Sequence, residues 1–174
     1  GTMLTLNAAR SSSNETYTFD SLSIKSNLEE NNVRRIDILS NDIVNGYIRG
    51  NFKYNQLKDI VENSLGSLYK NYSPNKIATN QFIEYDLEVQ NKIVGLLVPK
   101  LEIADKTSIS GKITADNGEF VLIMNTPYVK YDKNKVINLQ IDVNSLREHQ
   151  NAFIAIDTID LNVYKAYDFV LNNA

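Results

Sequence analysis

Three carboxylates at alternate positions are the residues of this chain best suited to chemistry. Glu84, Asp86 and Glu88 stand in a strand-like pattern, so they would lie on one face about 7 Å apart. Paired carboxylates of this kind can hydrolyse glycosides or hold a cation. The alternative is that they form the solvated face of an amphipathic strand, and we favour that interpretation because apolar residues occupy every intervening position.

Other catalytic chemistries lack their residues. The chain has no cysteine and one histidine, His149, so disulfides, thiolate metal sites and a cysteine nucleophile are excluded. His149 lies in the polar stretch 147–151, which we interpret as a hairpin loop. Asp116-Asn117-Gly118 resembles a hairpin turn more than a calcium loop, because it lacks further acidic ligands at alternate positions. We therefore expect no enzyme activity, no catalytic residue, no metal site and no cofactor.

Composition points to a folded domain without a nucleic-acid partner. The 174 residues carry a net charge of −3, and the longest basic run is Arg34-Arg35, too short for a nucleic-acid footprint. The most apolar stretch, 93–98, is far shorter than the roughly 20 residues that span a bilayer. Gly1-Thr2-Met3 looks like a cloning remnant. We expect residues 4–174 to form a single β-rich domain, excised from a longer chain.

Alternation of apolar and polar residues predicts most of the secondary structure. A period of two is typical of strands with one buried face, and it predicts about eight to eleven of them. The parity changes at Asp20-Ser21, which predicts a β-bulge. Residues 120–124 are apolar at every position, as in a strand covered on both faces. The predicted fold is mainly β, a large curled antiparallel sheet, trough-like or sandwich-like, with one amphipathic helix packed on it.

The predicted helix covers about residues 55–71. Its apolar residues recur at spacings of three and four, Asn55 can cap its start, and Ser73-Pro74 ends it. We expect it to pack on the apolar face of the sheet, and a lid over that face is the alternative. Gly66 suggests a close contact with a strand. The candidate lid residues are Leu57, Ile60, Val61, Leu65 and Leu68.

A sheet with one apolar face must cover it, and a single helix is too small for about ten strands. The sheet must fold on itself or bind an apolar ligand. Acyl chains are suitable occupants, because burying each methylene contributes about 0.8 kcal/mol without any specific hydrogen bond. The candidate groove residues are Ile83, Tyr85, Leu87, Val89, Leu139, Ile141, Leu161 and Val163.

Several segments carry a resemblance to a known family. The stretch 45–54 leads directly into the predicted helix with its Leu65-Gly66-Ser67-Leu68-Tyr69 sequence, and 87–94 and 137–142 follow later. Together these segments resemble the TamB-like translocation and assembly module proteins of Bacteroidetes, within the wider AsmA-like group. The likeness extends over most of residues 15–171.

The resemblance implies a location and partners. Such proteins are large, anchored in the inner membrane and extended across the periplasm of Gram-negative bacteria. Their strands roll into a hydrophobic trough proposed to conduct phospholipids toward the outer membrane, and some work with an outer-membrane barrel protein. A phospholipid or another acyl-chain ligand is thus the implied partner. The family brings no catalytic residues.

Two alternatives remain at this stage. The chain could be a secreted or surface-exposed β-sandwich that binds glycans or proteins through exposed aromatic residues, or a glycosidase using Glu84 and Asp86. A sheet cut from a longer one would also expose edge strands, so self-association is expected.

Overall fold

The computed structural model describes residues 3–9, 16–66, 71–116, 119–146 and 149–173, with side chains described from residue 18 onward except at 146–150. Strands dominate, with two α-helices and two 3-10 turns between them. The elements are β1 (Met3–Ala9), β2 (Thr16–Leu28), a 3-10 turn (Glu30–Asn32), β3 (Arg34–Leu39), β4 (Val44–Asn51), a second 3-10 turn (Tyr54–Gln56), α1 (Leu57–Gly66), β5 (Phe82–Val89), α2 (Asn91–Leu97), β6 (Leu101–Ile103), β7 (Thr107–Thr114), β8 (Glu119–Tyr131), β9 (Asn134–Leu146), β10 (His149–Asp160) and β11 (Lys165–Asn173).

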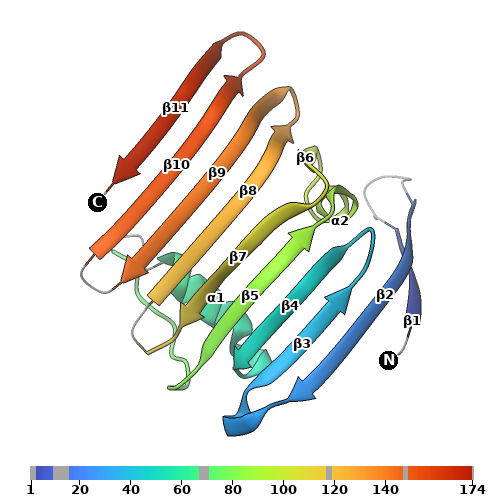
Figure 1. Ribbon diagram of the computed structural model, residues 1–174, viewed down its shortest axis with the longest axis vertical. Coiled ribbons are helices and arrows are strands. Elements are labelled where there is room, and N and C mark those ends of the chain that lie inside the picture. Colours follow the sequence, from blue (N-terminus) through green and yellow to red (C-terminus); the bar gives the residue numbers. More distant parts are fainter. Residues whose placement is uncertain (1–2, 10–15, 67–70, 117–118, 147–148, 174) are drawn as a thin grey trace.

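The strands form one open sheet in nearly sequential order. The order is β1-β2-β3-β4-β5-β7-β8-β9-β10-β11, with β6 paired to the far end of β8, and the ribbon shows this meander from blue to red (Figure 1). Each described pairing is antiparallel. The predicted mainly β, antiparallel fold with a helix on the sheet is confirmed.

Short hairpins explain this topology, since antiparallel neighbours need few connecting residues. Tyr131 pairs with Asn134, so two residues turn the chain, and Asp132 takes a positive φ of 55° there. Leu146 pairs with His149. His149 therefore begins β10 and does not lie within a loop extending over 147–151, as the sequence suggested.

The predicted bulge in β2 is present. Leu4 pairs with Leu22 and Leu6 with Phe19, so Thr5 stands opposite both Asp20 and Ser21. The extra residue explains why the apolar parity of β2 changes at this point.

The helix inserted between β4 and β5 is shorter than predicted. α1 extends over Leu57–Gly66 and follows a 3-10 turn. Tyr72 lies beyond the helix with its ring against Gly66: a Cβ at Gly66 would sit 2.5 Å from that ring. The nearest neighbour of Gly66 is therefore the Tyr72 ring. Leu68 lies outside the described residues.

A second helix was not predicted. α2 covers Asn91–Leu97, and its start is tied to the β6–β7 connection, because Asp105 accepts a hydrogen bond from the Asn91 N–H at 2.9 Å. The sequence pattern here is seven residues long, too short for helical periodicity to stand out. Within the described residues, neither helix is long and apolar enough to cross a bilayer.

Two further strand assignments differ from the pattern. β10 ends at Asp160, and Leu161 and Val163 lie in the turn before β11, 45% and 91% exposed. Residues 120–124 are not covered on both faces either, since Phe120 is buried whereas Ile123 is 38% exposed.

The core sits where α1 crosses one face of the sheet. Ile60 of the helix packs with Ile83, Ile113 and Phe120 from β5, β7 and β8, and all four are buried. Because one helix covers only part of a ten-strand width, the core is compact and central, and the rest of the face is left with less cover.

Candidate functional site

The pairing register places the large apolar residues of successive strands on one face. Ile36 pairs with Ile48, Ile48 with Tyr85, Tyr85 with Gly111 and Gly111 with Leu122. Directly paired residues share a face, so this row runs across β3, β4, β5, β7 and β8 on the side that carries α1. We call this side the apolar face.

α1 presents two neighbouring stripes to that face. Ile60 and Ser64 are buried, Ile60 belongs to the core cluster, and the Ser64 hydroxyl donates to the Ile60 carbonyl at 2.9 Å. Leu57, Val61 and Leu65 follow at intervals of four and line an open space beside the contact. Val61 and Leu65 remain 41% and 46% exposed. The first stripe thus attaches the helix through Ile60, with Leu57 also packed against the core, and the second stripe forms the wall of a cavity.

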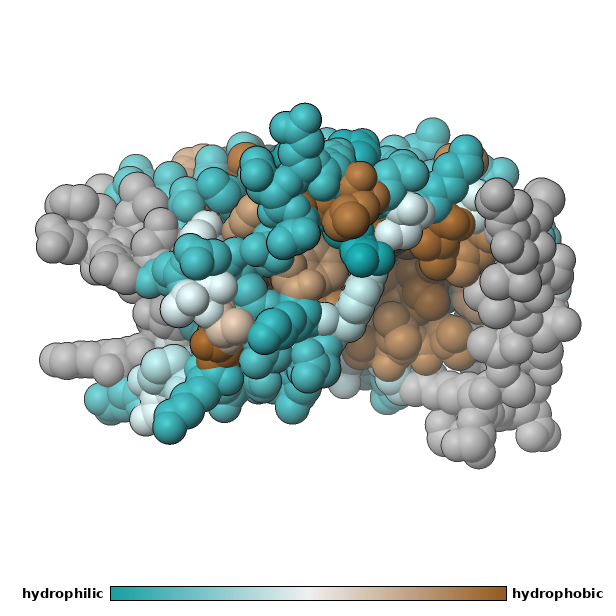
Figure 2. All heavy atoms as spheres, turned by 90° about the horizontal axis from the view of Figure 1, so that it is seen from below, coloured by the Kyte–Doolittle hydropathy of each residue, from teal (hydrophilic) through white to brown (hydrophobic). Residues whose placement is uncertain are grey.

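The cavity between α1 and the sheet has a volume of about 470 Å³. This is within the usual range of ligand sites, roughly 300–1,000 Å³. From the side shown in Figure 2, hydrophobic residues lie recessed between hydrophilic ones. The lining consists entirely of aliphatic and aromatic residues: Ile36, Ile48, Phe52, Tyr54, Leu57, Val61, Leu65, Ile83, Tyr85, Leu87, Ile109, Ile113, Phe120 and Leu122.

Tyr85 forms part of the floor. Its hydroxyl donates to the Val121 carbonyl at 3.2 Å, and burial raises the pKa of this phenol. The ring reaches over Gly111, where a Cβ would lie 2.6 Å from the tyrosine oxygen and 2.0 Å from the Val121 carbonyl oxygen. The hydroxyl is therefore engaged with the backbone, and the floor of the cavity is apolar.

The rim of the cavity is aromatic at the end of β4. Phe52 and Tyr54 meet edge to face with centroids 5.6 Å apart, and Tyr54 is 56% exposed. The Arg34 guanidinium lies 5.5 Å from the centre of the Tyr54 ring. This is where a charged side chain approaches the lining.

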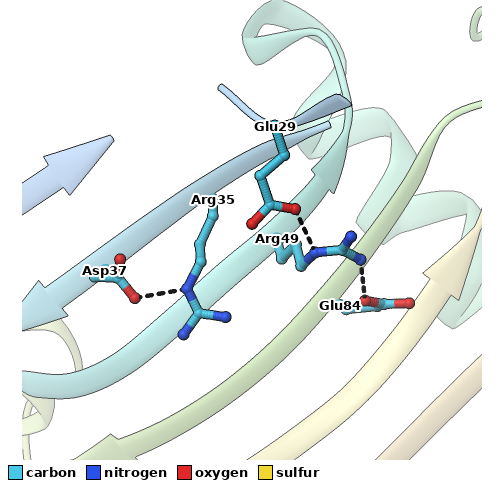
Figure 3. A network of polar contacts seen from close by, with 5 residues as sticks. All are labelled: Glu29, Arg35, Asp37, Arg49 and Glu84. Carbon is cyan, nitrogen blue, oxygen red and sulfur yellow. Dashed lines mark hydrogen bonds and ion pairs between the residues drawn. The ribbon is translucent and has the colours of Figure 1, made fainter. Parts of the chain in front are cut away.

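Over β3, β4 and β5, the opposite face of the sheet is polar and carries a network of ion pairs (Figure 3). We call this side of the sheet the polar face. Arg49 donates to Glu29 at 2.9 Å and to Glu84 at 3.0 Å, and Arg35 pairs with Asp37 at 2.8 Å. The side chains of these pairs are about one-third exposed, so solvent screening leaves each pair a small contribution to stability.

The three alternating carboxylates do lie on this polar face. Glu84 is engaged by Arg49, Glu88 accepts a hydrogen bond from Gln90 at 3.3 Å, and Asp86 is exposed. In the part of the chain that the structure describes, no group of three or more acidic or imidazole side chains is placed to hold a metal ion. The geometry fits the amphipathic-strand interpretation.

The predicted groove residues separate into three sets. Ile83, Tyr85 and Leu87 line the cavity. Leu161 and Val163 do not belong to the groove, because they lie in the β10–β11 turn. Val89, Leu139 and Ile141 are on the apolar face but outside the lining.

Two different rows of paired residues contain Val89, Leu139 and Ile141. Ile141 continues an apolar row, since it pairs with Met124, Met124 with Ile109 and Ile109 with Leu87. Val89 and Leu139 are separated by Thr107 and Thr126, which are buried and whose hydroxyls are 2.8 Å apart. The row of Val89 and Leu139 is therefore interrupted by a polar pair.

The predicted lid residues also divide. Leu57, Val61 and Leu65 line the cavity, whereas Ile60 is buried in the helix–sheet contact. The sequence did not assign the lining residues on β3, β4, β7 and β8 to the groove. Their alternation was visible, but the register that places Ile36, Ile48 and Leu122 in one row with Tyr85 is a property of the folded sheet.

Comparison of this chain with models of protein families, with curated proteins and with solved structures finds no match.

Proposed function

We propose that this chain is a non-catalytic lipid-handling module whose cavity beneath α1 holds a phospholipid acyl chain. The observation that carries the proposal is the lining: fourteen residues from α1, the end of β4 and five strands, all aliphatic or aromatic. Water in such a space lacks polar partners, whereas each methylene placed there gains about 0.8 kcal/mol.

The dimensions of the cavity support an elongated ligand. The lining crosses five neighbouring strands, β3 to β8, which at four spacings of about 4.8 Å amounts to roughly 19 Å. Tyr85 offers no free hydroxyl on the floor, so the cavity favours a chain without polar groups along its length.

The cellular setting is a second part of the proposal. The resemblance to TamB-like proteins supports a place in the periplasm or cell envelope of a Gram-negative bacterium, in a longer protein anchored in the inner membrane. An outer-membrane barrel protein is the partner that this likeness suggests. Fractionation of cells carrying a tagged full-length protein would test the location, and recovery in the cytosol would contradict it.

The glycan-binding alternative has less support. A β-sandwich would require two sheets, and the described strands form one. Tyr85 is in the cavity floor and Tyr54 at its rim, whereas the exposed Tyr131, Tyr164 and Tyr167 lie outside the cavity lining.

The test of the proposal is lipid occupancy. We expect lipid to be recovered by extraction and mass spectrometry from the purified protein, and a neutral fluorescent probe such as N-phenyl-1-naphthylamine to bind and be displaced by lipid. Val61→Phe, which fills the cavity from its wall, should weaken probe binding about tenfold. Val163→Phe is the matched control, because Val163 is 91% exposed in a turn. Protein that is free of lipid and does not bind the probe would contradict the proposal.

A further inference from the structure

Arg34 is a charged residue at an apolar position of the sheet. It pairs with Gly50 and alternates with Ile36 and Ile38 along β3, so its side chain leaves the sheet on the apolar face. Ile36, two residues further, lines the cavity. A guanidinium keeps its charge at any physiological pH, so its place beside an apolar lining requires an explanation.

The neighbouring arginines have carboxylate partners, and Arg34 does not. Arg35 pairs with Asp37 and Arg49 with Glu29 and Glu84, all on the polar face. The contacts of Arg34 within the described residues are a long hydrogen bond to the Ser26 hydroxyl, 3.4 Å, and the ring of Tyr54. No carboxylate in that part of the chain neutralises it.

Tyr54 connects the charge to the cavity. The same ring lines the cavity, lies under the guanidinium and contacts Phe52. The simplest alternative is a solvated arginine whose stem covers apolar surface while its head stays in water. That alternative predicts no preference of the cavity for charged ligands, so the two explanations differ in a measurable way.

We propose that Arg34 binds the phosphate of the lipid whose acyl chain occupies the cavity. Guanidinium groups bind phosphate through two parallel hydrogen bonds, and Arg34 has donors left for such a contact. The ligand is then an anionic amphiphile with its head at β3 and its chain running toward β8. This inference rests on the proposed function and adds the class and orientation of the ligand.

The experiment compares three ligands on the intact chain. Decyl phosphate carries chain and charge, decanol carries the chain alone, and inorganic phosphate carries the charge alone. Each displaces N-phenyl-1-naphthylamine or is titrated by calorimetry, with the wild type, Arg34→Gln, Arg34→Lys and the control Arg35→Gln. Arg35 is matched in type and strand, but its side chain lies on the polar face in an ion pair with Asp37.

We expect the wild type to bind decyl phosphate about tenfold tighter than decanol, as a charge-assisted hydrogen bond provides. Arg34→Gln should reduce this ratio to about one while decanol affinity stays unchanged, which also shows that the variant is folded. Arg34→Lys should keep part of the ratio, and Arg35→Gln all of it.

Three results would overturn the inference: equal wild-type affinities for decyl phosphate and decanol, a ratio unchanged in Arg34→Gln, or inorganic phosphate competing as well as decyl phosphate. Decanol binding distinguishes a wrong role for Arg34 from a wrong proposed function, because decanol requires only the acyl-chain cavity. If decanol binds without a phosphate preference, the acyl-chain cavity stands and the role of Arg34 is wrong. If neither decanol nor decyl phosphate binds, both proposals are wrong.

Discussion

Replacing Ile60 with alanine tests whether α1 is attached to the sheet through one buried side chain. Ile60 is 1% exposed and packs on Ile83, Ile113 and Phe120. The substitution removes three carbons, which at about 0.8 kcal/mol each amounts to about 2.4 kcal/mol of lost transfer free energy. The space left behind adds to this, so we expect a loss of about 3–4 kcal/mol in the free energy of unfolding.

Val61→Ala is the matched control on the next helical position. Val61 is 41% exposed and faces the open cavity, so the two carbons it loses were only partly removed from water. The expected loss is about 1 kcal/mol, lowered further because alanine is the better helix former.

Guanidinium unfolding followed by circular dichroism measures both variants. With a slope of roughly 4 kcal/mol per molar denaturant, Ile60→Ala should lower the midpoint by about 0.8 M and Val61→Ala by about 0.2 M, with unchanged slopes. Equal losses for the two variants would refute the assignment of Ile60 to the attachment and Val61 to the cavity wall.

Three other perturbations have defined outcomes. Gly111→Ala places a Cβ 2.6 Å from the Tyr85 oxygen and 2.0 Å from a backbone carbonyl oxygen. We therefore expect the free energy of unfolding, measured by thermal unfolding, to fall by on the order of 2 kcal/mol, and an unchanged value would contradict the close packing of Tyr85. Burial raises the pKa of Asp42, but hydrogen bonds, the Lys92 ammonium at 2.8 Å among them, outweigh it and leave the pKa below its ordinary 3.8. The contribution of Asp42 to stability is therefore complete above pH 3.8 and disappears as the pH falls through the lowered value, so Asp42→Asn should flatten the acid limb of the stability curve, and an identical limb would contradict the assignment. Val170 on the edge strand β11 is 61% exposed, and unpaired strand edges tend to pair with a second copy. If β11 does so, sedimentation should show a concentration-dependent dimer, and Val170→Lys should weaken that dimer.

Alternation in the sequence was sufficient for most strands and even for one irregularity. The bulge opposite Thr5 is visible as a parity change at Asp20-Ser21 because a single extra residue moves every later side chain to the other face. The same reasoning failed at residues 161–163, where alternation continues through a turn. Asn162 has a φ of 68° there, and its N–H donates to Asp160 at 3.1 Å, so the turn is made by local polar contacts that a hydrophobic pattern does not register.

The helix and the cavity show a second limit of sequence reasoning. The spacing of Leu57, Ile60, Val61 and Leu65 predicted an apolar helix, but not that Ile60 would be enclosed while the others border open space. That difference depends on where α1 crosses the sheet. The position of α1 is set in part by the buried Gln81. This side chain accepts a hydrogen bond from the Lys53 N–H, 28 residues away, at 2.7 Å, and it donates to the Ala78 carbonyl just before β5.

The width of the sheet explains why the apolar face remains open. α1 has ten residues, about 15 Å in length and about 10 Å in diameter, whereas ten adjacent strands extend over roughly 43 Å. The apolar row that contains the cavity-lining Leu87 and Ile109 continues through Met124, Ile141 and Ile154 to Leu171 at the far edge, where Leu171 is 42% exposed. Contiguous apolar surface of this kind is characteristic of a binding site. If the cavity holds a lipid chain, as we propose, an apolar surface leads from that chain toward β11, and this continuity is the physical basis that we propose for moving a ligand along the sheet.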